Sequence, residues 1–439
     1  MAGAFNNIHP GLSHGEALRL LALPLEELDS GSDYYMAASH LINFPGRDSE
    51  EALLKLVVDP RCDQSVQLAR RKAVEVLARL QCDAAIAPIG VCLGSDDIYL
   101  VENAAWALQQ LDCQDPTLQD RMVGLLADER QNRRVLVQAL AGLQVKAALP
   151  PIQALINDPV AGVRGAALAA IAQLSGSQEG LEPLADHLVL PNQMDRQAAI
   201  QDVIDAGDAR LLPMVMKAPV SPVFRMRALR RFWDAAAGLP GFHRLAALDQ
   251  LLRDEPEALQ LVHRYDEPPT DEFLVQEFFG TDFSRCYLAL MTLKQRDAAV
   301  LWPLLRRRWD EEAHNDYGAH YFFVRLFGSL TDWPDDAHEW IVECLEEAVR
   351  NRRPQFMKSK PAALLSLQQQ SPQRLLARLP EWLNPELMPF WESRYAALLA
   401  AESLLGPATV GWHNLVQALL QDPEVLIVQR AHQLQPAQG

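Results

Sequence analysis

Apolar residues recur along the first half of the chain in a helical pattern with a period of about 32 residues. Five segments align without gaps when each is anchored on its last core residue: Leu80, Leu111, Leu143, Leu174 and Ala206. Three, six and seven residues before each anchor the side chain is apolar or small, as at Leu77, Val74 and Ala73. Residues at these spacings share one face of an α-helix. The pattern therefore predicts five helices, each with one buried face.

A turn precedes each of these helices, and a shorter apolar segment precedes each turn. Residues 94–97 and 157–159 carry the Gly, Ser, Asn, Asp and Pro residues that are typical of turns and helix caps. Several of the shorter segments have proline in the first helical turn, where it is tolerated: Pro88, Pro151, Pro183 and Pro213. Helix–turn–helix units must stack to bury their faces. We therefore expect an all-α fold, a curved α-solenoid of HEAT-like repeats.

The repeat extends upstream and weakens downstream. Residues 34–44 fit the same register with Phe44 as the anchor, residues 225–237 fit it loosely, and the period decays after Gly238. Further helical units are predicted near residues 283–293, 320–330 and 393–404. We expect a regular array over 13–238, an irregular helical continuation over 239–432, and mobile ends over 1–12 and 433–439.

Composition narrows the class of protein. The chain has 439 residues, a net charge of −17 and 49% hydrophobic residues, of which few are aromatic, so most of it should fold and Leu, Ala and Val should build its core. No basic stripe is present, which argues against a nucleic-acid partner. No apolar stretch is long enough to span a membrane, and no secretory signal is visible. The six scattered cysteines are expected to be reduced, in a cytoplasmic protein.

Sequence motifs of nucleotide-dependent and serine-hydrolase enzymes are missing: there is no GxGxxG, GxxxxGK[ST] or GxSxG run. His314 and His320 invite a metal interpretation, but their spacing matches no zinc motif. We expect neither a metal nor a resident cofactor.

Polar columns of the repeat identify a candidate binding surface. Ten residues before the anchor, an arginine recurs at Arg70, Arg133, Arg164 and Arg196, and such arginines usually pair with the Asp of a neighbouring turn. Nine and five residues before the anchor, one helix face carries a phenol, guanidiniums, a carboxylate and an indole: Tyr35, Arg71, Glu102, Trp106 and Arg134. These five residues are called the inner strip below. Trp106 either faces a ligand or packs against a neighbouring loop or helix.

A second cluster spans residues 314–323 and includes Tyr317, His320 and Tyr321. One interpretation is a structural cap with half-buried aromatic rings. The other is that curvature of the solenoid brings this turn over the inner strip and closes a pocket. The inner strip suits a flat, conjugated, anionic ligand, because guanidinium groups bind carboxylates and aromatic rings stack on π-systems.

Two runs resemble the E/F-type phycobilin lyases of cyanobacteria: Ser-Asp-Tyr-Tyr-Met-Ala-Ala at 32–38 and Tyr-Leu-Val-Glu-Asn-Ala-Ala-Trp-Ala-Leu at 99–108. The likeness covers roughly residues 20–330, and the single long chain is similar to the phycoerythrin-directed members, including lyase-isomerases. The Asn-His-Cys run of the isomerising phycoviolobilin lyase is absent, so isomerisation stays open. The resemblance implies a bilin substrate, phycoerythrobilin, that becomes attached to a cysteine of a phycoerythrin subunit.

Roles for individual residues follow from this implied chemistry. Tyr317 or Tyr35 would transfer a proton, and Glu102 or Asp33 would bind the pyrrole N–H groups. Arg71, Arg133 and Arg134 would bind the propionates, and Trp106, Tyr34, His320 and Tyr321 would contact the chromophore. A non-catalytic HEAT scaffold that binds only a protein, and a chaperone for bilins or phycobiliproteins, are the alternatives.

Overall fold

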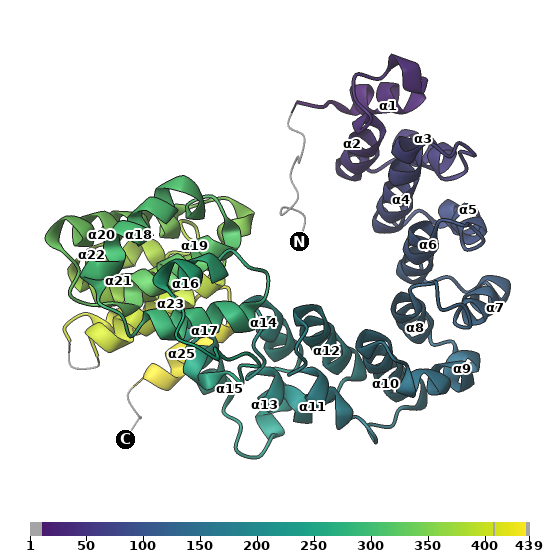
Figure 1. Ribbon diagram of the computed structural model, residues 1–439. Coiled ribbons are helices and arrows are strands. Elements are labelled where there is room, and N and C mark those ends of the chain that lie inside the picture. The colour runs from purple at the N-terminus through teal and green to yellow at the C-terminus, as the bar shows by residue number, and fades with distance from the viewer. Residues whose placement is uncertain (1–10, 407–408, 436–439) are drawn as a thin grey trace. The chain divides into compact units, whose positions relative to one another are not determined.

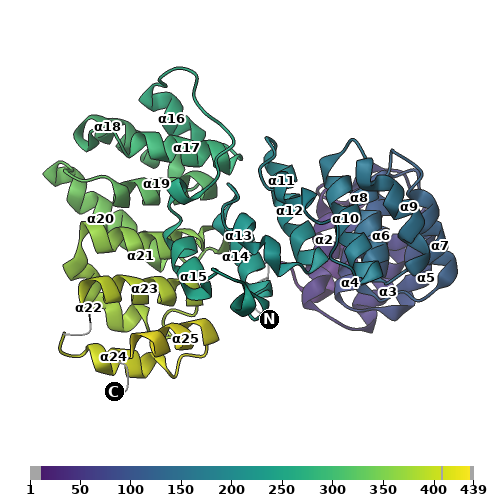
Figure 2. The ribbon, with the colours of Figure 1, turned by 90° about the horizontal axis from the view of Figure 1, so that it is seen from below.

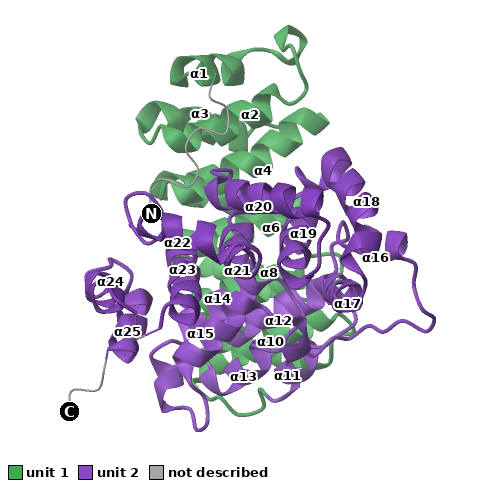
Figure 3. Ribbon diagram, turned by 90° about the vertical axis from the view of Figure 1, so that its left-hand side faces the viewer, with its two compact units in different colours: residues 1–181, 205–207 green, residues 182–204, 208–439 purple. Residues whose placement is uncertain are grey.

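The structure is a computed structural model, and it describes residues 11–406 and 409–435. Within these ranges the chain forms helices and loops without any β-strand, which confirms the predicted all-α fold. The chain divides into two compact units, shown in Figure 3: unit 1 holds residues 1–181 and 205–207, and unit 2 holds 182–204 and 208–439. This division does not test the predicted loss of regularity at residue 238. The ends predicted to be mobile lie mostly outside the described residues, which exclude 1–10 and 436–439.

Unit 1 is a stack of helix pairs, and the second helices of successive pairs, α2, α4, α6, α8 and α10, lie side by side (Figure 1). Its helices are α1 (His14–Ala22), α2 (Asp33–His40), α3 (Arg47–Val57), α4 (Gln64–Arg79), α5 (Ile86–Cys92), α6 (Ile98–Gln110), α7 (Pro116–Leu125), α8 (Arg133–Gly142), α9 (Leu149–Gln153) and α10 (Ala161–Ser175). The predicted HEAT-like repeats are thus present, with the stacked pairs burying each other's apolar faces.

The predicted core columns form the core of unit 1. Ala73, Val74 and Leu77 of α4 are fully buried, and the equivalent residues of α6 and α8 are buried as well. The small alanines of this column let neighbouring second helices approach closely. Each helix pair therefore contributes to one continuous hydrophobic core that runs from Ala17 to Leu174.

Most repeats end their second helix in a similar way. A residue in the left-handed conformation directly follows four of the five anchors: Gln81, Asp112, Gln144 and Gly207. In three of these repeats the next N–H group donates to the carbonyl five residues earlier, as from Cys82 to Leu77 at 3.1 Å. This bond closes the last helical turn and satisfies a carbonyl that would otherwise lack a partner. In these three repeats the following turn starts at the same position.

Unit 2 is larger and less regular. Its helices are α11 (Pro183–His187), α12 (Gln193–Ala206), α13 (Leu212–Val215), α14 (Pro222–Arg231), α15 (Arg244–Arg253), α16 (Asp271–Glu277), α17 (Phe283–Leu293), α18 (Ala298–Arg308), α19 (Tyr317–Ser329), α20 (Asp335–Arg350), α21 (Ser359–Gln370), α22 (Pro372–Trp382), α23 (Trp391–Leu404), α24 (Trp412–Leu419) and α25 (Val425–Leu434). The three helical units predicted downstream correspond to α17, α19 and α23.

Helix α21 is the centre of unit 2, with α19, α20, α22 and α23 packed around it (Figure 2). Most of its residues are buried, including the charged Lys360. Aromatic residues fill the space beside α19, where the rings of Phe278 and Phe322 stack at 5.3 Å. No helix of the described chain has the length and apolar character needed to cross a membrane.

Candidate functional site

The inner-strip arginines of unit 1 already have partners in the protein. Arg71 of α4 forms a bidentate ion pair with Asp97, the residue that caps α6, through Nε–Oδ2 at 2.9 Å and Nη2–Oδ1 at 2.8 Å. Arg134 of α8 donates from Nη1 to the carbonyl of Gly162 at 2.6 Å. These bonds join each second helix to the start of the next one, so both arginines contribute to the stacking of the repeats.

The recurring arginine column has the structural role that such columns usually have. Arg133 pairs with Asp158 of the next turn at 2.6 Å. Arg164 donates to the carbonyls of Asp158 and Pro159, and the guanidinium of Arg70 donates to the carbonyl of Val57. Arg133 was also expected to bind a carboxylate ligand, and Asp158 occupies its guanidinium here.

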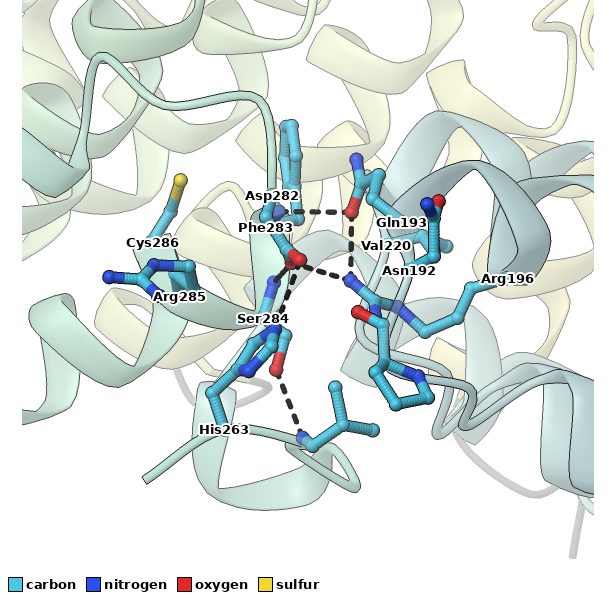
Figure 4. A network of polar contacts seen from close by, with 12 residues as sticks. Asn192, Gln193, Arg196, Val220, His263, Asp282, Phe283, Ser284, Arg285 and Cys286 are labelled. Carbon is cyan, nitrogen blue, oxygen red and sulfur yellow. Dashed lines mark hydrogen bonds and ion pairs between the residues drawn. The ribbon is translucent and has the colours of Figure 1, made fainter. Parts of the chain in front are cut away.

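Arg196 continues this column in unit 2, and Figure 4 shows its network. Its guanidinium is fully buried and pairs with Asp282 at 2.5 Å, while His263 contacts the other oxygen of the same carboxylate at 3.0 Å. Gln193 accepts a bond from Arg196 at 3.1 Å and another from the backbone of Phe283 at 3.0 Å. The network ties α12 to the start of α17.

The remaining residues of the inner strip are accessible. Tyr35 is 39% exposed, and Nζ of Lys72 lies 5.3 Å from its ring. Glu102 and Trp106 on α6 are half-buried. The indole of Trp106 packs against the core, and the guanidinium of Arg79 lies 5.9 Å from it. Helices α2, α4, α6 and α8, which carry the inner strip, are consecutive neighbours in unit 1.

Four of the predicted site residues are buried: Asp33, Tyr34, His320 and Tyr321. Tyr34 is 1% exposed, and its hydroxyl donates to the carbonyl of Leu23. Asp33 beside it is also buried and accepts a bond from the backbone of Ser30 at 2.9 Å. His320 and Tyr321 are buried in unit 2. Their side chains point into the packing of neighbouring helices, which a helical register alone does not reveal.

The turn at residues 314–323 forms the start of α19, with Asp316 as its cap. His320 packs against Trp309, and its Nδ1 lies 3.0 Å from the Oγ of Ser359. Burial lowers the pKa of the His320 imidazole to about 3, so the ring is neutral at pH 7. The part of the chain that the structure describes holds no cluster of three side chains that could bind a metal.

Tyr317 and Tyr321 meet at a lysine that the sequence did not single out. Nζ of Lys358 lies 5.5 Å from the ring of Tyr317, 5.3 Å from that of Tyr321 and 4.8 Å from that of Phe283. Tyr317 is 60% exposed, so this aromatic cluster reaches the surface. Burial lowers the pKa of the Lys358 ammonium to about 8. The only sequence signal was a lysine placed directly before an apolar helix.

A cavity of about 330 Å³ adjoins this lysine in unit 2. Its walls are mostly apolar and come from α14, α15, α21 and the loops before α21 and α23: Pro222, Val223, Met226, Leu251, Leu252, Pro354, Met357, Pro361, Ala362 and Phe390. Tyr321, Gln355, Lys358, Glu392 and Ser393 add polar groups to the lining. An apolar cavity with a few polar groups is the usual form of a small-molecule site.

A buried polar cluster lies behind the cavity. Asp254 receives hydrogen bonds from Tyr321, from Tyr287 at 2.7 Å and from Arg225, and Arg325 approaches it to 3.6 Å. Burial raises the pKa of both phenols, which keeps them protonated as donors. The hydroxyl of Tyr321 is therefore held by Asp254, whereas that of Tyr317 has the exposure that proton transfer to a ligand needs.

The inner strip and the aromatic turn belong to different compact units. The expected closure of the turn over the inner strip therefore stays a prediction. Each unit carries its own candidate surface: the inner strip in unit 1, and the cavity with Lys358, Tyr317 and Tyr321 in unit 2.

Comparisons with known proteins add a family context. Residues 124–204 match the family described as HEAT repeats. The chain is 43% identical over 380 residues to the bilin biosynthesis protein CpeY of Synechococcus sp. (strain WH8020), covering 86% of this chain and 90% of that protein. It is 29% identical over 202 residues to the phycocyanobilin lyase subunit alpha of Picosynechococcus sp. (strain ATCC 27264 / PCC 7002 / PR-6), covering 41% of this chain and 75% of that subunit. Among solved structures, a chain of the complex of CpcE and CpcF of phycocyanin lyase from Nostoc sp. PCC7120 aligns with a TM-score of 0.46 and 23% identity, covering 59% of this chain and 98% of that one.

Proposed function

The chain belongs to the E/F-type, HEAT-repeat phycobilin lyase family, and from this premise we propose that it attaches phycoerythrobilin to a cysteine of a phycoerythrin α-subunit. The observation that carries the proposal is the 43% identity to a bilin biosynthesis protein, because the aligned region covers 86% of this chain and so includes most of both units.

The reaction is the addition of a thiol to a double bond. The acceptor cysteine's S–H bond breaks, its sulfur bonds to the ethylidene carbon of the bilin A-ring, and a proton is delivered to the tetrapyrrole. No oxidant or reductant is consumed. The lyase must hold the bilin, orient its A-ring towards the acceptor and supply the proton at the right atom. Because the nucleophile comes from the acceptor protein, none of the six cysteines of this chain needs a catalytic role.

Tyr317 and Tyr35 are the proposed proton-transfer residues. Both phenols are accessible to a ligand, at 60% and 39% exposed. Glu102 is the proposed acceptor for the pyrrole N–H groups, and half-buried Trp106 provides a surface on which a conjugated ring can stack. The burial of Asp33 makes it a less accessible acceptor than Glu102.

Isomerisation to phycourobilin is a second candidate activity, favoured by the similarity of this single chain to lyase-isomerases. A double-bond shift removes a proton from one carbon and returns one to another, so it needs no further reactant. One tyrosine could serve both the attachment and the shift.

Co-expression with phycoerythrobilin synthesis and a phycoerythrin α-subunit tests the proposal. We expect a covalent adduct that survives denaturation and absorbs as phycoerythrobilin, or as phycourobilin if the lyase also isomerises. Tyr317→Phe or Tyr35→Phe should slow attachment by about 100-fold, since general acid–base groups contribute at least that much. Tyr99→Phe, at another exposed tyrosine, is the matched control.

Two results would overturn the proposal or part of it. If the bilin mixed with the chain shows no spectral shift and no adduct forms, the chain is a protein-binding scaffold instead of a lyase. A bilin that binds without ever becoming attached favours the chaperone alternative. If both tyrosine variants attach bilin at the wild-type rate, the assignment of the proton-transfer residue is wrong although the activity stands.

A further inference from the structure

The ammonium of Lys358 lacks a negative partner. Among the described residues it makes neither an ion pair nor a hydrogen bond, and its contacts are the three aromatic rings of Phe283, Tyr317 and Tyr321. A cation over aromatic faces gains some stabilisation, but less than a carboxylate would supply at a partly desolvated site. Lys358 also directly precedes α21, whose N-terminal end carries the positive pole of the helix dipole. The surroundings of Lys358 in unit 2 therefore favour the binding of a negatively charged group.

The cavity next to Lys358 has a second unused polar group. Ser393 is fully buried and lines the cavity, and its Oγ has no hydrogen-bond partner. A buried hydroxyl without a partner is unfavourable, so such groups in native proteins usually serve a ligand or an ordered water. Glu392 lines the same cavity, and burial raises the pKa of its carboxyl group. Together these groups complement a ligand that has an apolar body, a carboxylate and ring N–H groups.

The arginines predicted to bind propionates already have partners within the protein. Arg71, Arg133 and Arg134 in unit 1 bind carboxylates or a carbonyl of the protein itself. A bilin brings two propionates, and a carboxylate entering a largely apolar site needs a cation that is free to pair with it. Lys358 meets this requirement.

We propose that the unit 2 cavity receives a pyrrole ring of the bilin, that Lys358 binds the propionate of that ring, and that the Oγ of Ser393 hydrogen-bonds to the ring. This inference rests on the proposed function, because it takes the bilin as the ligand. A cavity of about 330 Å³ lies at the small end of the range for ligand sites, so it would hold part of a linear tetrapyrrole while the remainder stays outside. Exposed Tyr317, whose ring lies 5.5 Å from the same ammonium, would then lie close to the bound chromophore.

The test is a titration of the purified full chain with phycoerythrobilin and with its dimethyl ester, followed by absorbance and fluorescence. Lys358→Met keeps the aliphatic length and removes the charge. We expect it to raise the Kd of the free acid at least about tenfold and to leave the Kd of the ester nearly unchanged, because only the acid has the anion. Lys358→Arg should retain most of the affinity for the acid. Lys217→Met, at an exposed lysine of the same unit, is the control and should change neither Kd by more than about twofold.

Ser393→Ala provides a second and separate readout. The change removes a hydroxyl that has no partner in the empty protein, so thermal stability should not fall. If the hydroxyl bonds to the bilin ring, the variant weakens binding of the acid and the ester alike, by about threefold or more. A loss of affinity without any loss of stability separates ligand binding from a structural role.

The outcomes separate this inference from the proposed function. If the wild-type chain binds the acid and Lys358→Met binds it equally well, the propionate site is elsewhere and this inference fails while the lyase proposal stands. If Lys358→Met weakens the acid and the ester equally, the lysine acts through packing, which also overturns the inference. If the wild-type chain binds neither form and produces no adduct, the proposed function fails and the inference fails with it.

Discussion

The two compact units handle positive charge differently. In unit 1, the arginines of the second helices pair with the turn of the next repeat, as Arg71 does with Asp97 and Arg133 with Asp158. The partners are supplied by the repeat itself, since each turn comes at the same distance along the chain. Unit 2 keeps this pairing in places, as between Arg394 and Asp422 at 2.7 Å, but not every cation of unit 2 has such a partner. Arg225 and Arg325 share the buried carboxylate of Asp254, whereas Lys358 makes no ion pair among the described residues and lies beside aromatic rings.

This difference indicates at which cation an incoming carboxylate would gain the most binding free energy. A surface whose charges are already paired gains little from an incoming carboxylate, because the protein must first give up its own ion pair. A desolvated cation without a partner gains much more. We therefore expect substitutions of the paired arginines of unit 1 to act mainly on stability, and substitutions of Lys358 to act mainly on ligand binding.

The largest expected effect comes from the buried cluster of unit 2. Asp254→Ala would leave two guanidinium groups buried without their carboxylate and should lower the free energy of unfolding by about 3–5 kcal/mol. Urea unfolding followed by tryptophan fluorescence measures this, since all tryptophans except Trp106 lie in unit 2.

Asp254→Asn is the matched variant for that measurement. Asp254 has a φ of 48°, a left-handed conformation that asparagine tolerates better than alanine, so the asparagine variant isolates the loss of charge. It should destabilise unit 2 less than alanine does. A loss below about 1 kcal/mol for Asp254→Ala would contradict the view that this carboxylate holds the cluster together.

A smaller effect is expected at the link between repeats in unit 1. Asp97 caps α6 by accepting from the N–H groups of Tyr99 and Leu100, and it pairs with Arg71. Asp97→Ala removes both interactions and should lower the stability of α4 and α6 by about 2 kcal/mol, whereas Asp97→Asn keeps the cap and should lose about 1 kcal/mol or less. Hydrogen exchange of residues 64–110 measures the change.

The same pair of variants sharpens the comparison between the units. Asp97→Asn also frees the guanidinium of Arg71. If Arg71 is a propionate ligand in competition with Asp97, affinity for the free bilin acid rises in this variant. If no propionate binds at Arg71, the affinity stays the same. Equal stabilities of Asp97→Asn and Asp97→Ala would contradict a contribution of the side-chain cap.

The smallest expected effect is on the pH dependence of binding. The pKa of Lys358 in the empty protein is lowered to about 8, so its ammonium is present at pH 7 and mostly lost by pH 9. The charged neighbours that oppose this shift are Asp316, Asp254 and Cys286 when ionised. Affinity for the bilin acid should therefore fall several-fold, at most about tenfold, between pH 7 and pH 9.

Two controls define this pH effect. A carboxylate bound to Lys358 stabilises the ammonium, so the affinity begins to fall near the pKa of the empty protein and levels off near the higher pKa of the complex. The dimethyl ester and the Lys358→Met variant should show no such fall. An acid affinity that is constant from pH 7 to pH 9 in the wild-type chain would argue against a carboxylate on this lysine.

Sequence patterns predicted the repeat register and the paired helices well. The core columns around Leu77, Leu108 and Leu140 are buried as expected, because an apolar residue at a fixed helical spacing has one favourable place to go. The accessible positions of Tyr35 and Tyr317 were also found from the sequence. The burial of Tyr34 and Tyr321 was not predicted. The groups that bind their hydroxyls, on Leu23 and Asp254, lie outside the helices that carry the two tyrosines.

Local pattern thus determined the fold class, the repeat and the residues that could form a face of each second helix, because these depend on spacings within one or two helical turns. The convergence of Tyr321 and Lys358 on one cavity, with the ring of Tyr317 beside the lysine, came from the packing of α19 against α21. Contacts of that kind are set by how irregular helices fill a shared core, and no spacing in the chain records them. Whether a basic side chain forms an ion pair also depends on the tertiary structure. Arg71 and Lys358 are both basic residues in the sequence, and only their neighbours in space make Arg71 a structural link and leave Lys358 without an ion pair in the described part of the chain.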